Sequence, residues 1–279
     1  MKNYIGACIT FLYLVAYLIL GPWSKDIDLY LCGFLLLAIG IPHGAGDHLI
    51  AEKIAKRENL TFHLQPFVIY YLVIMLAYAA LWYISPRFSF IIFIAISVFH
   101  FGDMEDVQPV ESTKMWTNRV KTVCLGAGIL SFILVSHWPE AYHIIRSMQV
   151  KVPPSLPKFS LLASLSFLGS GFQKKNFHPF FNTFLALLIG YFLPLIPAFI
   201  CYFSCCHAAT SFEGMRKHLE MEIVELYKKL TPFSLGALLL GVIYTNLVTN
   251  DLQLFPFFIF LSLLTLPHFL LMHKLIKRV

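Results

Sequence analysis

The chain has 279 residues, of which 58% are hydrophobic and 13% are charged, and its formal net charge is +6. A soluble domain carries roughly 25% charged and 45–50% apolar residues, so this composition excludes an ordinary soluble protein and predicts an integral membrane protein. A positive excess in such a protein is typical of cytoplasmic loops rich in Lys and Arg. The apolar composition predicts the lipid bilayer as its partner. The sequence has no basic stripe with interleaved aromatic residues, so we expect no nucleic-acid partner.

Apolar segments follow one another along the chain. A membrane-spanning helix needs about 20 mostly apolar residues, and the strong candidates are residues 4–20, 29–45, 66–84, 88–101, 120–137, 233–248 and 254–272. The apolar region 179–206 is too long for one span and contains Pro194 and Pro197, so we expect two helices that turn at these prolines. The loops are too short to hold a soluble domain, and the sequence predicts one integral membrane domain over residues 1–279.

The short apolar segment 159–171 decides the predicted topology. Basic residues after the second and fourth helices, such as Lys53 and Arg119, place those loops in the cytoplasm. If residues 159–171 also span, a later basic set faces the cytoplasm, namely Arg216, Lys217, Lys228, Lys229, Lys274, Lys277 and Arg278. We therefore predict an all-α transmembrane bundle of about ten helices with both termini in the cytoplasm.

Four histidines fall at one depth in this topology. They are His43 in "GIPHGAGDH", His100 in "SVFHFGDME", His207 in "CYFSCCHAATSFEG" and His268 in "LTLPH". Each lies near the cytoplasmic end of an even-numbered helix, and inward side chains of facing helices can form a metal site. Imidazole binds Fe, Zn, Cu and Ni, and iron with an open coordination position can activate O₂. The alternative interpretation is four separate interfacial histidines, each bonded to a carbonyl group or to water.

Two carboxylates lie close to these histidines in the sequence. Asp47 follows His43 by four residues and Asp103 follows His100 by three, which is one turn if the helix continues. A carboxylate at that place orients an imidazole or binds the metal itself, and both roles stay open.

The motifs "GIPHGAGDH", "FHFGD", a histidine that ends a late helix and "LTLPH" resemble the Brp/Blh family of membrane-embedded bacterial β-carotene 15,15′-dioxygenases. The resemblance covers nearly the whole chain in the same order. It implies a non-haem Fe(II) enzyme of the bacterial inner membrane that cleaves the central double bond of β-carotene with O₂ into two retinal molecules. His43, His100 and His207 match the first three ligand positions of the family, and the resemblance makes them the expected catalytic residues.

One position departs from the family pattern. The family has a second histidine four residues after the third ligand, and this chain has Ser211 there, beside the expected metal. Serine is a poor iron ligand, so three interpretations remain. The site works with three histidines, or His268 of the family's "PH" motif completes it, or the protein is a paralogue with altered or lost chemistry.

Two other functions compete with the oxygenase. Ionisable residues inside a membrane also mark transport pathways, so a transporter or channel is one alternative. An internal inverted repeat would favour a transporter, but the sequence has no convincing repeat, and histidines at one face favour a site over a pathway. The other alternative is a membrane protein that binds a polyene or a metal without turnover, which Ser211 favours.

Overall fold

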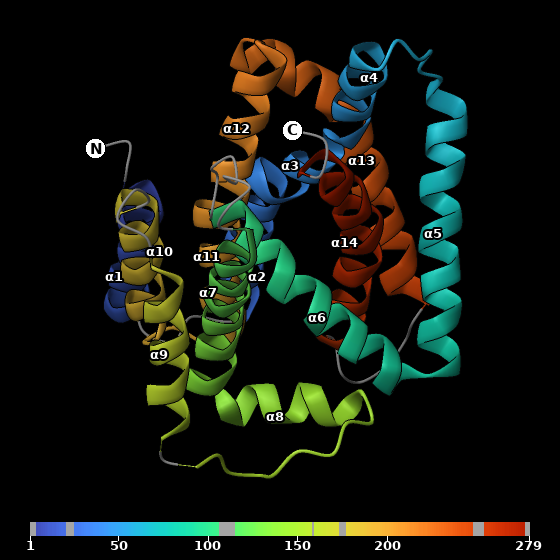
Figure 1. The fold of residues 1–279 in the computed structure, drawn as a ribbon. Coiled ribbons are helices and arrows are strands. Elements are labelled where there is room, and N and C mark those ends of the chain that lie inside the picture. The colour runs from blue at the N-terminus through green and yellow to red at the C-terminus, as the bar shows by residue number, and fades with distance from the viewer. Residues whose placement is uncertain are drawn as a thin grey trace. The chain divides into compact units, whose positions relative to one another are not determined.

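The computed structural model describes residues 4–20, 25–105, 115–157, 159–172, 177–247 and 254–276, and these ranges contain helices and no β-strand (Figure 1). The all-α prediction is therefore confirmed for the described residues. The helices are α1 (Ile5–Leu20), α2 (Lys25–Leu35), α3 (Ile41–Ala45), α4 (Asp47–Arg57), α5 (Leu64–Ile84), α6 (Pro86–Glu105), α7 (Met115–Ser136), α8 (Trp138–Ser147), α9 (Ser160–Gly171), α10 (Phe177–Gly190), α11 (Leu195–Tyr202), α12 (Ala209–Leu219), α13 (Ile223–Leu247) and α14 (Leu254–Ile276). Two π-helical segments, η2 (Leu36–Gly40) and η5 (Phe203–Ala208), continue α2 and α11.

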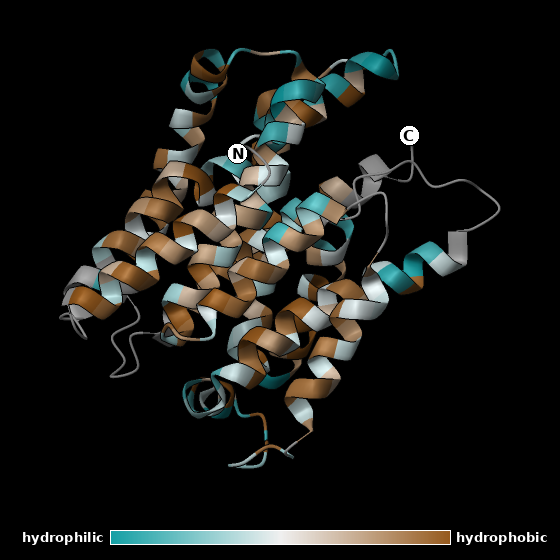
Figure 2. Ribbon diagram, turned by 90° about the vertical axis from the view of Figure 1, so that its left-hand side faces the viewer, coloured by the Kyte–Doolittle hydropathy of each residue, from teal (hydrophilic) through white to brown (hydrophobic). Residues whose placement is uncertain are grey.

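Within the described residues, six helical stretches are long and apolar enough to cross a membrane, judged by length and composition. They are Tyr30–Arg57, Leu64–Ile84, Pro86–Asp103, Thr117–Ser136, Leu195–Leu219 and Ile223–Tyr244. Four shorter apolar helices of 10–17 residues are Ile5–Ile19, Ser160–Gly171, Phe177–Gly190 and Phe258–Met272. Figure 2 shows hydrophobic residues along most of these helices. Each apolar segment predicted from the sequence thus corresponds to a helix.

The predicted turn is present and ends at Pro194, while Pro197 lies in the first turn of α11. Helix α10 ends at Gly190 and α11 begins at Leu195, after Pro194 in extended conformation. Two side chains from the end of α7 and the start of α8 hold this turn. His137 Nε2 lies 2.8 Å from the carbonyl oxygen of Leu193, and the Leu195 N–H donates to Glu140 Oε2 at 3.0 Å.

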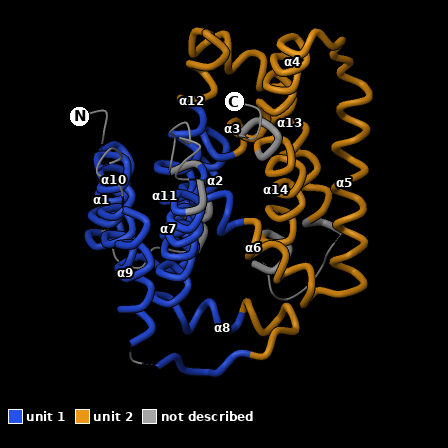
Figure 3. The backbone as a smooth tube through the Cα atoms, viewed as in Figure 1, with its two compact units in different colours: residues 1–40, 97–143, 152–212 blue, residues 41–96, 144–151, 213–279 orange. Residues whose placement is uncertain are grey.

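The chain divides into two compact units (Figure 3), unit 1 with residues 1–40, 97–143 and 152–212, and unit 2 with residues 41–96, 144–151 and 213–279. The prediction of one integral membrane domain stays a prediction. In unit 1, α11 and η5 form the core, and every residue of η5 is buried. Helices α1 and α10 pack against this core, and α9 packs along α7.

Glycines set the closest helix crossings of unit 1. A Cβ atom on Gly126 of α7 would lie 1.8 Å from the carbonyl oxygen of Val98, and a Cβ on Gly102 of α6 would lie 2.0 Å from that of Thr122. The next glycine of the "GAG" stretch, Gly128, makes a similar approach to the backbone of Leu168 in α9. Close packing at this stretch therefore fixes the end of α6 against α7.

In unit 2, α13 packs on α3 and on α14, while α14 also packs on α4 and α5. The buried face of α5 carries Met75, Tyr78 and Trp82. Tyr78 donates a hydrogen bond to the Ser89 carbonyl oxygen at 2.8 Å, and Trp82 donates to Ser262 Oγ at 2.8 Å. Polar atoms of this buried face therefore find partners inside the unit, as a low-dielectric environment requires.

Candidate metal centre

Unit 1 brings two of the predicted ligands together. His100 lies near the end of α6 and His207 lies in η5, and both imidazoles are buried. Their Nε2 atoms are 3.2 Å apart and the ring centroids are 4.8 Å apart. Two imidazoles bound to one first-row metal at about 2.0–2.1 Å hold their nitrogens about 3 Å apart. The pair therefore fits two ligands of one metal ion.

Aromatic rings surround the unit 1 pair. The ring of Phe101 meets His207 edge to face at 4.9 Å between centroids, and Phe203 stacks on His207 at 5.7 Å. Phe101 in turn contacts Tyr202 edge to face at 5.5 Å. Apolar rings of this kind exclude water and strengthen electrostatic interactions at the imidazoles.

The two π-helical segments pack against each other beside the His100–His207 pair. Segment η2 packs on η5, and a Cβ atom on Gly40 would lie 3.2 Å from Phe203 Cε1 and 3.3 Å from Ser204 Oγ. Glycine at this position therefore permits the close approach of η2 to the segment that carries His207. Single π-helical turns occur frequently at functional sites.

Unit 2 brings the other two predicted ligands together. His43 in α3 and His268 in α14 are both buried, and their rings meet edge to face at 5.1 Å between centroids. His43 follows Pro42, and His268 follows Pro267, which lies inside α14. The four predicted ligands thus form two pairs, one in each unit.

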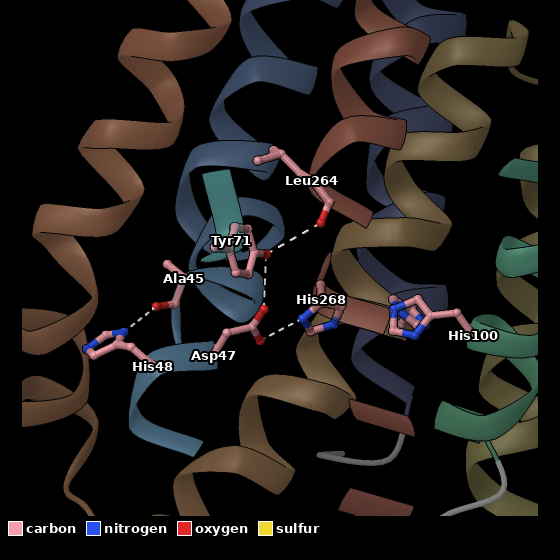
Figure 4. A network of polar contacts seen from close by, with 8 residues as sticks. Ala45, Asp47, His48, Tyr71, His100, Leu264 and His268 are labelled. Carbon is pink, nitrogen blue, oxygen red and sulfur yellow. Dashed lines mark hydrogen bonds and ion pairs between the residues drawn. The ribbon is translucent and has the colours of Figure 1, made fainter. Parts of the chain in front are cut away.

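A carboxylate and a phenol hold His268 in place (Figure 4). His268 Nδ1 lies 2.7 Å from Asp47 Oδ1, and the Tyr71 hydroxyl donates to Asp47 Oδ2 at 3.0 Å. The same hydroxyl lies 3.4 Å from the carbonyl oxygen of Leu264, one turn before His268. The sequence spacing predicts Asp47 as a neighbour of His43, and the structure shows His268 as its hydrogen-bonded partner.

The second histidine of the "GIPHGAGDH" motif lies differently. His48 Nδ1 donates to the Ala45 carbonyl oxygen at 2.9 Å, and its ring stacks on Phe233 at 4.0 Å between centroids. The stacking joins α4 to α13, the hydrogen bond is local to the end of α3, and both give His48 a packing role in unit 2.

The two remaining predicted residues lie in unit 1. Ser211 is buried in α12, four residues after His207 in a continuous helical path from η5. Asp103 lies on α6 three residues after His100 and is partly exposed. Their roles beside a metal stay predictions.

Sequence reasoning missed Tyr71 and the aromatic rings around His207. Tyr71 lies four residues before Met75 and seven before Tyr78, and so falls on the buried face of α5. A spacing of seven residues between Tyr71 and Tyr78, followed by Trp82, was the available signal. It is weak because almost every residue of α5 is apolar.

Buried imidazole pairs, with a carboxylate on one of them, are the kind of residue set with which helical proteins bind metal ions. The comparisons with known proteins give the family. A family model described as beta-carotene 15,15'-dioxygenase matches residues 34–276. The chain is also 23% identical over 248 residues to a protein of uncultured marine bacterium 66A03 named beta-carotene 15,15'-dioxygenase, and the alignment covers 85% of this chain and 90% of that protein. No solved structure matches. The chain belongs to the beta-carotene 15,15'-dioxygenase family.

Proposed function

We propose that this protein is a non-haem iron dioxygenase that cleaves the central double bond of β-carotene with O₂. The bond is replaced by two carbonyl groups, so both oxygen atoms of O₂ end in two molecules of retinal. The observation that carries the proposal is the 3.2 Å separation of the His100 and His207 Nε2 atoms in a chain of this family. Family membership supports a carotenoid as the class of substrate.

We assign the iron ligands to both histidine pairs, His43 with His268 and His100 with His207. The resemblance of the motifs supports His43, His100 and His207 as catalytic residues. The bond to Asp47 supports His268 as the fourth ligand. Bound iron with an open coordination position supplies the O₂-activating chemistry. Ser211, a poor iron ligand, occupies the position where the family has its further histidine.

The surrounding residues orient the imidazole of His268 for metal binding and shield that of His207 from water. A carboxylate only accepts hydrogen bonds, so the bond from His268 to Asp47 keeps the proton on Nδ1 and the lone pair on Nε2. The rings of Phe101 and Phe203 exclude water from His207. Exclusion of water protects a reactive centre from side reactions.

We further propose a single membrane domain in the bacterial inner membrane, with about ten spanning helices and cytoplasmic termini. The apolar helices and the positive-inside distribution of Lys and Arg support this topology. Reporter fusions after Glu58, Val110 and Lys217 should all report the cytoplasm. A periplasmic signal after Lys217 would show that α9 does not span.

The experiment that tests the function is expression in a bacterium that makes β-carotene. Colour should fade and retinal should accumulate with the natural chain, and His100→Ala should abolish both changes. Equal pigment and no retinal with the natural chain and with His100→Ala would contradict the proposal. Binding of β-carotene to the purified chain without retinal would instead favour the non-catalytic alternative that Ser211 raises.

A further inference from the structure

We propose that Tyr71 is a positioning residue for the metal centre, which acts through Asp47 on the imidazole of His268. The inference rests on the proposed function, because it takes His268 as a metal ligand. It assigns a role to a side chain that lies in an otherwise apolar helix, α5.

Two hydrogen bonds set the orientation of Asp47. Asp47 begins α4, and its two oxygens have different partners, since Oδ1 accepts from His268 Nδ1 at 2.7 Å and Oδ2 accepts from the Tyr71 hydroxyl at 3.0 Å. With both oxygens engaged, rotation about the carboxylate axis would break two hydrogen bonds. The plane of the carboxylate is therefore fixed relative to the imidazole.

Tyr71 also contacts the helix that carries His268. Its hydroxyl oxygen lies 3.4 Å from the carbonyl oxygen of Leu264, four residues before His268 in α14. The hydroxyl has one hydrogen, and the shorter contact, to the carboxylate, takes most of it. Tyr71 therefore joins α4, α5 and α14 at the level of His268, and the view in Figure 4 shows the hydroxyl directed at both partners.

The bond between Asp47 and His268 is buried. Asp47 and His268 are almost completely inaccessible, so water does not compete for these hydrogen bonds. In a low-dielectric environment each member of such a network strengthens its neighbour. Loss of the Tyr71 hydroxyl should allow the Asp47 carboxylate to move and should weaken its hydrogen bond with His268.

The chain offers a matched control for Tyr71. Tyr78 lies seven residues later on α5, and its hydroxyl donates to a backbone oxygen, that of Ser89, at 2.8 Å. Tyr78→Phe removes one hydroxyl from the same helix and leaves Asp47 untouched. Both Tyr→Phe variants should therefore change the thermal unfolding temperature by similar amounts.

The test is Co(II) binding to the purified full-length protein, measured by competition with a chromophoric chelator and by the visible absorption of the bound ion. Tyr71→Phe should weaken Co(II) binding roughly tenfold and shift the absorption bands, since changes to partners that orient a ligand typically cost 10–100-fold. Tyr78→Phe should do neither. Asp47→Asn, which keeps the shape and loses the charge, should weaken binding at least as much as Tyr71→Phe.

A double variant separates positioning from general destabilisation. If Tyr71 acts through Asp47, Tyr71→Phe should add little to Asp47→Asn, because residues in one network are not additive. Full additivity, or equal losses of Co(II) binding in Tyr71→Phe and Tyr78→Phe, would overturn the inference. His268→Ala distinguishes the two levels of the proposal. Unchanged Co(II) binding in His268→Ala would overturn the ligand assignment and the inference together, while loss there with normal binding in Tyr71→Phe would overturn the inference alone.

Discussion

The two histidine pairs are held by different kinds of contact. In unit 1, His207 lies among Phe101 and Phe203, and closely packed helices fix its neighbour His100. In unit 2, His268 is bonded to Asp47, which Tyr71 holds from its other side. The first environment constrains an imidazole by shape and the second by directional hydrogen bonds. The two pairs should therefore respond to different substitutions.

The largest effect in this comparison should come from the helix crossing of unit 1. A methyl group at Gly126 would overlap the carbonyl oxygen of Val98 at 1.8 Å, and backbone cannot move aside as a side chain can. We expect Gly126→Ala to lower the free energy of unfolding by about 3 kcal/mol or more, at the upper end of the range for overpacking.

Thermal unfolding of the detergent-solubilised protein measures this change. Gly169→Ala is the matched control, because a Cβ atom there meets nothing within 4 Å and the residue is exposed on α9. Equal stability of the two variants would show that the α6–α7 crossing does not constrain the unit.

A second substitution tests Ser211, which lies on the same continuous helical path as His207. Ser211→His should raise iron affinity by about tenfold, a modest gain for an added ligand, because positions four residues apart share a helix face. Retinal yield should rise with it if a carotenoid is the substrate.

The same substitution tests whether His268 compensates for the missing histidine. His268→Ala should then be more damaging with Ser211 than with histidine at that position, as iron content and retinal formation in the four combinations would show. If His268→Ala had the same effect with serine and with histidine at position 211, His268 would not compensate for the missing histidine.

The smallest of the three effects concerns the aromatic ring that touches His207. Phe101→Leu keeps an apolar side chain and removes the edge-to-face contact at 4.9 Å. We expect the free energy of unfolding to fall by about 1 kcal/mol, the worth of an aromatic pair beyond its buried area. Co(II) binding should change less than it does in Asp47→Asn. If Phe101→Leu weakened Co(II) binding more than Asp47→Asn does, packing around His207 would matter more than the hydrogen bond to His268.

Much of this architecture was predictable because its signals are local. Apolar runs gave the helices, and Pro194 gave the turn before α11 because proline disfavours helical continuation. The sequence also marked His43, His100, His207 and His268 as one set. It did not show how they pair, because pairing depends on contacts between helices far apart in the chain.

The polar partners were harder to predict for a physical reason. Tyr70 and Tyr71 are neighbours in one apolar helix, yet Tyr70 is exposed while Tyr71 bonds to Asp47. Where nearly all residues are apolar, hydrophobic periodicity does not identify the inward face. The π-helical segments beside His43 and at His207 likewise had no signal in the sequence.

The most direct test of the central claim is the iron content of purified protein in which one whole pair is removed at a time. The natural chain should hold roughly one iron, as expected for a single site built from inward side chains of a helix bundle. The variants His100→Ala/His207→Ala and His43→Ala/His268→Ala should each lose nearly all of it, since we propose ligands from both pairs. Iron retained at the natural level in both double variants would contradict the claim that these histidines bind the metal.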